Sequence, residues 1–318
     1  MNPDASKLPA PVPPSPGDHA RPSHLRAPGI FAHSLAWIVL AISLAASTGG
    51  WFIARQHDAL AGRKRFVEQV TRIQTTLVER MSVYQDVLHG GVGLFAASVS
   101  VERAEWRAYV QAVSVNARFP GIDALGFVAR VPRRQLGAFL QTTRADQTPG
   151  FALKQPGTNG DFYIIKYLEP EPEHAAMIGV DLGADPARRA VADAARDTGN
   201  AVISGPLNLR SVSGTRVNGL IMMLPVFRNG TPSATLAERR ANLAGWIYAR
   251  FITAQLLDDI LRDQTRQLRF QVFDQPESGP EKLIFDSDPP AGGTAAVRSP
   301  RFEDMNYLPV GKHLWRLC

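Results

Sequence analysis

The most apolar part of the chain lies near its N-terminus. From Ala27 to Ala54 there is no Lys, Arg, Asp or Glu, and the centre is the strongly apolar run Leu35–Leu44. About 20 apolar residues cross a bilayer as a helix. We therefore predict a transmembrane helix over residues 29–54. A buried core helix and a cleaved signal peptide are the alternatives, but the charge-free length disfavours the first and the long leader disfavours the second.

The segments on either side of this span differ in composition. Residues 1–28 are rich in proline, with small and polar residues between, so we predict a disordered cytoplasmic tail that cannot bury enough apolar surface to fold. Fewer basic residues precede the span than follow it, and a simple count would place the following chain in the cytoplasm. Large domains are translocated despite such charge, so the charge pattern leaves the orientation open.

A helical pattern follows the span. From Asp58 to Ser98, apolar residues recur at steps of three or four, which predicts one apolar stripe along a long helix. The segment 90–93, Gly-Gly-Val-Gly, interrupts the pattern. It lacks the preceding strand and following lysine of a phosphate-binding loop, so a kink or close packing is the better explanation. A second helix is predicted from Val101 to Phe119. Together these segments form stalk and flanking helices over residues 55–118.

The remainder of the chain alternates between short strands and helices. One helix is bounded by an N-cap and proline at Asp185-Pro186 and by a stop at Gly199, and another is predicted over Ile252–Asp263. The pattern predicts an α+β fold with an antiparallel sheet, divided into two subdomains. The chain ends within a predicted strand, which we interpret as truncation. Strands are predicted at Ala124–Val131, Phe162–Leu168, Ala201–Ser204, Gly219–Phe227, Leu243–Phe251, Leu268–Phe273, Lys282–Phe285 and His313–Leu317.

Composition and motifs exclude several functions. The formal net charge of +6 comes from scattered arginines that do not gather with aromatics, so no nucleic-acid partner is expected. The single cysteine, Cys318, excludes an internal disulfide and a zinc site built from several thiolates. There is no serine-hydrolase elbow, zinc-protease helix or phosphate loop, so we predict no enzyme activity and no cofactor. A periplasmic hydrolase and a structural or adaptor protein are the alternative functions.

Several motifs in the second half occur in an order that is similar to one family. From about Gln85 onward the chain resembles the CHASE family of extracytoplasmic sensory domains, which occur in histidine kinases, nucleotide cyclases and cyclic-dinucleotide enzymes. No single motif is specific, but their order across about half the chain is. The matching residues are Phe119–Ile122, Leu125–Phe127, Val131, Tyr167–Pro170, Ile178–Asp181, Arg188, Ala195, Thr198-Gly199, Ile203-Ser204, Pro225–Phe227 and Gly245-Trp246.

The resemblance implies an architecture and a location. It implies tandem PAS-like antiparallel-sheet subdomains after the stalk: a membrane-distal, ligand-binding one over residues 119–252 and a membrane-proximal one over residues 253–318. It also implies a homodimer through the stalk helices, anchored in the bacterial inner membrane with the sensor domain in the periplasm. The parent protein would be a histidine kinase or a diguanylate cyclase or phosphodiesterase, whose output domain this chain lacks.

The resemblance also suggests where a ligand would bind. In the plant receptors of the family an aspartate contacts cytokinin, an adenine derivative. Here the corresponding segment contains Tyr167 and Glu169, and its spacing to Asp181 differs, which argues against cytokinin itself. Glu169 is the candidate polar anchor for a small polar ligand, and Ser204 could offer a hydroxyl. A sensor therefore predicts a pocket near Glu169 and Ser204, whereas an adaptor predicts a solid domain.

Three further candidates each have a structural alternative. Asp181 could face the pocket or cap a turn. Arg130 could meet an anionic ligand or lie exposed at the end of its strand. The cluster Glu169, Glu171, Glu173 and His174 contains the densest set of possible metal ligands, but alternating Glu-Pro residues favour a solvated, extended loop, so no metal is predicted.

Overall fold

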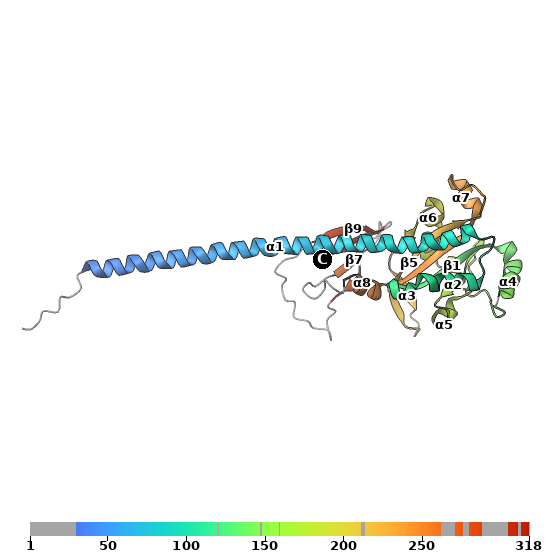
Figure 1. Ribbon diagram of the computed structural model, residues 1–318, viewed down its shortest axis with the longest axis horizontal. Helices are drawn as coiled ribbons and strands as arrows, with labels where there is room; N and C mark the ends of the chain where they lie inside the picture. Colours follow the sequence, from blue (N-terminus) through green and yellow to red (C-terminus); the bar gives the residue numbers. More distant parts are fainter. Residues whose placement is uncertain are drawn as a thin grey trace, which may run out of the picture. The chain divides into compact units, whose positions relative to one another are not determined.

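A computed structural model describes residues 30–119, 121–146, 148–158, 160–210, 214–261, 271–275, 280–287, 305–310 and 313–317 (Figure 1). The chain divides into two compact units, Met1–Gly62 and Arg63–Cys318. The predicted tail over residues 1–28 and the single cysteine, Cys318, lie outside the described residues.

In the first unit, helix α1 (Ile30–Ala97) begins one residue inside the predicted span. Its large apolar side chains are exposed in this region. Within the described part of the chain, no helix has both the length and the apolarity to cross a membrane. The predicted transmembrane helix over residues 29–54 is therefore not shown. The exposed side chains are Trp37, Ile38, Val39, Leu40, Ile42, Leu44, Trp51, Phe52 and Ile53.

In the second unit, α1 continues as the predicted amphipathic helix. Ile73, Leu77, Tyr84 and Leu88 are buried, at the three- and four-residue steps that bring side chains to one face of a helix. This stripe belongs to the hydrophobic core of the second unit. The expected homodimer through residues 55–118 is not tested by a single chain and stays a prediction.

The glycines at 90–93 allow close packing and do not interrupt α1. A Cβ atom on Gly90 would lie 2.6 Å from the hydroxyl of Tyr109, and one on Gly91 would lie 3.2 Å from the side chain of Ile247. The Tyr109 hydroxyl occupies this space because it donates a hydrogen bond to the carbonyl oxygen of Val87, at 2.9 Å. Tyr109 thereby attaches the next helix to α1.

That next helix is shorter than the sequence predicts. The expected helix over residues 101–119 is two helices, α2 (Arg103–Val113) and α3 (Val115–Arg118). They are separated at Ser114, whose φ of 54° lies in the left-handed region. The chain changes direction there because a continuous helix cannot include that conformation.

A six-stranded antiparallel sheet follows, in the order β2-β1-β6-β5-β3, with β4 paired to β5. Helices cover both of its faces. Consecutive residues of a strand point to opposite faces, and in β6 Ile247 packs on α1 while the indole N–H of Trp246 donates to Ala192 in α6, at 2.9 Å. The strands are β1 (Ile122–Pro132), β2 (Asp161–Glu169), β3 (Val202–Ile203), β4 (Leu207–Arg210), β5 (Arg216–Phe227) and β6 (Leu243–Ile252).

Helices of the second unit connect these strands. Helix α6 is bounded as predicted: the Asp185 carboxylate accepts from the backbone N–H of Arg188 at 3.0 Å, and Gly199 ends the helix with a φ of 75°. The other helices are α4 (Leu136–Ala145), α5 (Glu171–His174), α7 (Leu236–Asn242) and α8 (Thr253–Leu261), with 3-10 turns at Arg133–Gln135, Ala175–Met177 and Leu182–Ala184.

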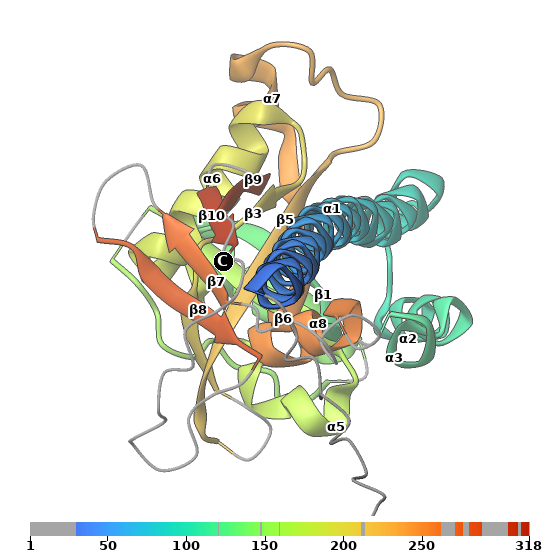
Figure 2. The same cartoon turned by 90° about the vertical axis from the view of Figure 1, so that its left-hand side faces the viewer.

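A second, four-stranded antiparallel sheet comes later in the chain, in the order β8-β7-β10-β9 (β7 and β8 are the orange strands labelled in Figure 2). Within the sheet, Val272 of β7 and Trp315 of β10 are buried. Its strands are β7 (Gln271–Gln275), β8 (Lys282–Asp286), β9 (Asn306–Val310) and β10 (His313–Leu317). A mixed fold with antiparallel sheets is confirmed, whereas the PAS-like identity of the two predicted subdomains stays a prediction.

Candidate functional site

Two arginines project from one face of α2. The helix begins with a capping box, in which the Glu105 carboxylate accepts from the backbone N–H of Glu102 at 2.8 Å. Arg103 and Arg107 are four residues apart, so they lie one above the other on the helix surface. Arg103 is buried, and its Nη1 donates to the hydroxyl of Thr148 at 2.9 Å.

Two glutamates face these arginines: Glu169, the last residue of β2, and Glu171, the first residue of α5. Arg103 Nε donates to Glu171 Oε2 at 3.1 Å, and its Nη2 pairs with the other carboxylate oxygen. Arg107 Nε donates to Glu169 Oε1 at 3.1 Å, while its Nη2 pairs with Glu171. The backbone N–H of Glu171 donates to Glu169 Oε2 at 3.0 Å. We call Arg103, Arg107, Glu169 and Glu171 the ion cluster.

Ion pairing favours the charged forms of Glu171 and Arg107. The hydrogen bond from Arg103 holds the pKa of Glu171 below its ordinary value, and the two arginine charges act in the same direction. The hydrogen bond to Glu169 raises the pKa of Arg107. The formal charges of the four groups cancel, which lowers the cost of holding Arg103 away from water.

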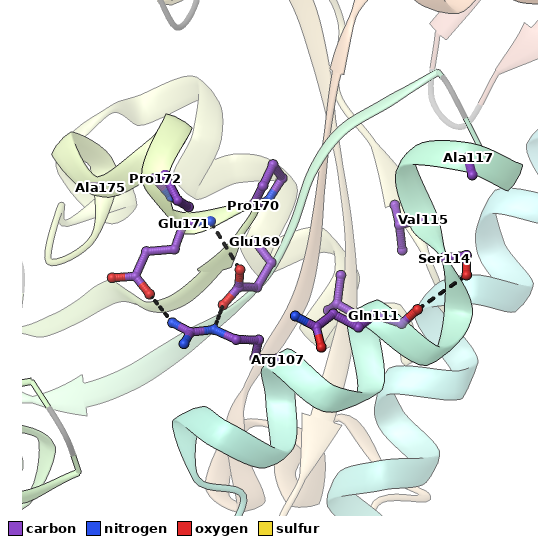
Figure 3. A pocket seen from close by; sticks show the side chains of 11 residues that line it. Arg107, Gln111, Ser114, Val115, Ala117, Glu169, Pro170, Glu171, Pro172 and Ala175 are labelled. Atoms are coloured by element: carbon purple, nitrogen blue, oxygen red, sulfur yellow. Dashed lines mark hydrogen bonds and ion pairs between the residues drawn. The ribbon is translucent and has the colours of Figure 1, made fainter.

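A groove of about 730 Å³ lies between α2–α3 and the β2–α5 connection (Figure 3). Figure 3 shows the guanidinium of Arg107 between the two glutamates, with Gln111 extending toward the same space. Apolar side chains form most of the remaining lining. The lining residues are Arg107, Val110, Gln111, Ser114, Val115, Ala117, Glu169, Pro170, Glu171, Pro172 and Ala175.

Of the five candidate ligand residues, Glu169 is the one that lines this groove. Tyr167 lies two residues earlier in β2 and is buried. Its hydroxyl donates to Asp146 Oδ2 at 2.6 Å and lies 2.9 Å from the carbonyl oxygen of Val101. Burial is the main reason why the pKa of Tyr167 is raised. Tyr167 therefore ties β2 to the segments that flank α2 and α4.

Asp181 and Arg130 also make internal contacts. The Asp181 carboxylate accepts from the backbone N–H groups of Tyr163 (2.8 Å), Gly157 (2.9 Å) and Gly183 (3.0 Å), which matches the turn-capping alternative. Arg130 Nε donates to Asp161 Oδ2 at 2.7 Å and its Nη1 to a backbone carbonyl at 2.6 Å. Neither residue lines the groove.

Ser204 lies elsewhere. It is buried, and its hydroxyl accepts from the backbone N–H of Ile221 at 3.0 Å. It lines a separate cavity of about 450 Å³, between α6, the segment 202–207 and residues of β7 and β8. The structure therefore does not bring Glu169 and Ser204 together in one pocket.

In the acidic cluster, Glu169 ends β2 and Glu171–His174 form the helical turn α5, so the extended loop expected from its prolines is not seen. Glu169 and Glu171 are engaged by arginines, and His174 is buried with its Nε2 3.2 Å from the carbonyl oxygen of Asp123. Among the described residues there is no group of three or more side chains that could hold a metal ion.

Sequence reasoning missed Arg103 and Arg107. The signal that could have found them is their i, i+4 spacing on a helix, but arginines are frequent in this chain and nothing local distinguishes these two. The acidic partners are more than sixty residues away in the sequence. Only the folded chain brings the two pairs together.

Comparison with known families identifies the class of this domain. The CHASE domain matches residues 99–285, which is more than half of the chain. The chain therefore belongs to the CHASE domain family of extracytoplasmic sensory domains. This confirms the resemblance that the sequence motifs indicated.

Two solved structures are similar at low identity. One is an extracellular ligand binding receptor from Desulfohalobium retbaense DSM5692 (11% identity, TM-score 0.46), which covers 78% of this chain, while the chain covers 38% of the receptor. The other is the periplasmic sensory domain of the Campylobacter jejuni chemoreceptor Tlp1 (10% identity, TM-score 0.45), with coverages of 79% and 90%. No curated protein matches the chain.

The ion cluster predicts a pH-dependent effect of substituting Glu171. Because the pKa of Glu171 lies below its ordinary value of 4.5, its ion pairs stabilise the fold above that pH and are lost as the pH falls through the lowered pKa. Glu171→Gln should lower the free energy of unfolding by about 2 kcal/mol at neutral pH. The deficit should shrink in acid, as measured by denaturant unfolding across pH.

Glu173→Gln is the matched control, because Glu173 is exposed on the same helical turn. It should change stability little at any pH. Equal losses in both variants, or a Glu171→Gln deficit that is independent of pH, would contradict the role given to Glu171.

Proposed function

We propose that the chain is the sensing part of a membrane-anchored receptor and that a small extracytoplasmic ligand binds in the groove beside the ion cluster. The observation that carries this proposal is that Glu169 lines a groove beside the ion cluster, in a domain of a sensory family. Its volume, about 730 Å³, falls in the range of small-molecule sites, and it combines apolar walls with a few polar groups.

Helix α2 suits the transmission of a signal from this groove. Its Arg107 and Gln111 line the groove, and its Tyr109 is bonded to α1 at Val87. A ligand that binds more tightly to one position of α2 than to another would shift the populations of both positions, and α1 would follow. The output enzyme of the parent protein, a histidine kinase or a cyclic-dinucleotide enzyme, belongs to the same proposal.

The alternatives have less support. A structural or adaptor protein predicts a solid domain, whereas the groove is open and is lined by a preorganised guanidinium. A hydrolase finds no support in a family that is sensory rather than catalytic.

Blocking the groove tests where the ligand binds. Ala117 is exposed and lines the groove, so Ala117→Trp should fill it without disturbing the core. A compound that raises the melting temperature of the wild-type protein in a thermal-shift screen should fail to do so in this variant. At 100 times the dissociation constant the wild-type protein should gain about 2.7 kcal/mol.

The matched control is Ala112→Trp, because Ala112 is exposed on α2 and does not line the groove. It should retain the full shift. If a compound stabilises both variants equally, it binds outside the groove. The cavity beside Ser204 would then be the next candidate for the binding site.

The membrane anchor is the other part of the proposal. Helix α1 exposes large apolar side chains from Trp37 to Ile53, each more than half exposed, along a stretch without Lys, Arg, Asp or Glu. Exposed apolar surface of this extent is unfavourable in water. A bilayer would shield every face of this charge-free stretch from water.

Charges placed in this stretch should release the protein from membranes. Each arginine at the centre of a span costs about 3 kcal/mol, so Leu40→Arg combined with Leu44→Arg should move the protein to the soluble fraction. Val78→Arg combined with Val83→Arg, at exposed positions further along α1, should leave the distribution unchanged. A wild-type protein that remains soluble after cell lysis would contradict the anchor.

A further inference from the structure

The accessible charge in the groove is positive. The side chain of Arg107 is 44% exposed, whereas the carboxylates of Glu169 and Glu171 are on side chains that are 12% and 27% exposed. Arg107 uses its Nε and Nη2 to bind the two glutamates, which fixes the plane of the guanidinium. Its Nη1 makes no hydrogen bond within the described part of the chain and remains available as a donor.

Both carboxylates in the groove already have partners. Glu171 is held by Arg103 as well as by Arg107, and Glu169 accepts from the backbone N–H of Glu171. A cationic ligand would have to displace an arginine from these glutamates. A ligand that accepts hydrogen bonds can instead bind the Nη1 group of Arg107. The glutamates already orient this guanidinium, so binding avoids the cost of ordering that side chain.

A further polar side chain of the groove, Gln111, also suits an acceptor. Gln111 lies four residues after Arg107 on α2, so its side-chain amide projects beside the guanidinium (Figure 3). An amide nitrogen supplies two N–H donors. On the opposite wall, Pro170 and Pro172 lack backbone N–H groups and present apolar rings. Val110 and Val115 complete an apolar space next to the two donors.

We infer that the ligand of this groove is a small monocarboxylic acid with an apolar body. Its carboxylate binds Arg107 and Gln111 through charge-assisted hydrogen bonds, and its body lies between the valines of α2–α3 and the prolines of the β2–α5 connection. This inference rests on the proposed function, because it names the ligand class for the same groove.

The test compares acids with isosteric neutral and cationic compounds. Butyrate, benzoate and phenylacetate are titrated into the full chain by calorimetry, together with benzamide and benzylamine. The acids should bind at least about tenfold more tightly than benzamide, because a hydrogen bond between two charged groups is stronger than one to a neutral amide. Benzylamine should bind more weakly still. Tighter binding of the amine, or failure of every acid to bind at millimolar concentration, overturns the inference.

Variants then assign the binding to the named donors. Arg107→Gln should weaken acid binding at least about tenfold, whereas Arg134→Gln, at an exposed position outside the groove, should not change it. Gln111→Leu leaves the ion cluster intact, so it should weaken acid binding even if Arg107→Gln impairs folding. Acid affinity that is unchanged in Gln111→Leu and in a folded Arg107→Gln overturns the inference.

The failure of this inference can be told from the failure of the proposed function. A neutral or cationic compound whose binding is lost in Ala117→Trp would end the assignment to carboxylic acids and leave the groove as the ligand site. Acids that bind to Ala117→Trp and to Arg107→Gln as tightly as to the wild-type protein would contradict both the assignment to carboxylic acids and the groove as the binding site.

Discussion

The ion cluster is the interaction on which the rest of the site depends. It joins α2 to Glu171 of α5 through Arg103, which is buried, and to Glu171 and Glu169 of β2 through Arg107, which is half exposed. Burying Arg103 is tolerable only because a bidentate carboxylate compensates its charge. The groove lies beside these ion pairs, and Arg107, Glu169 and Glu171 line it.

Helix α2 therefore has two attachments with different chemistry. One is ionic and lies at the groove, and the other is the hydrogen bond from Tyr109 to Val87 of α1. Gly90 makes the second attachment possible, since a side chain there would occupy the place of the tyrosine hydroxyl. In the proposed function α2 is the two-state element, because a ligand that changes the balance at the ionic attachment would also affect the attachment to α1.

The sequence predicted those helices and strands whose apolar pattern and end signals match the structure that they adopt in the fold. The strands β1, β2, β5 and β6 are buried runs with clear turn signals, and α6 has both an N-cap and a glycine stop. The sequence did not predict α4, α7, β4 or β9, which are short elements with weak apolar patterns. The sequence pattern also predicted one helix where the structure has α2 and α3. The left-handed conformation that separates them is usually indicated by glycine, and here it occurs at Ser114.

The site was harder to predict than the fold. Family resemblance indicated Glu169 but could not indicate Arg103 or Arg107, whose partners are distant in sequence. The sequence also indicated polar residues whose hydrogen bonds are made within the fold. These residues are Asp181, Arg130 and Tyr167. A polar residue close to a strand end can equally satisfy backbone groups or face a ligand, and sequence spacing does not distinguish the two.

The central claim is that Arg103 and Glu171 stabilise the fold as a pair, and a double-mutant cycle measures this most directly. The free energies of unfolding of the wild-type protein, Arg103→Met, Glu171→Gln and the double variant give the coupling energy. We predict a coupling of about 2 kcal/mol at neutral pH, because Glu171→Gln leaves the buried Arg103 without its carboxylate and Arg103→Met removes the group that binds both oxygens of Glu171. A coupling below about 0.5 kcal/mol, as expected for independent residues, would contradict it.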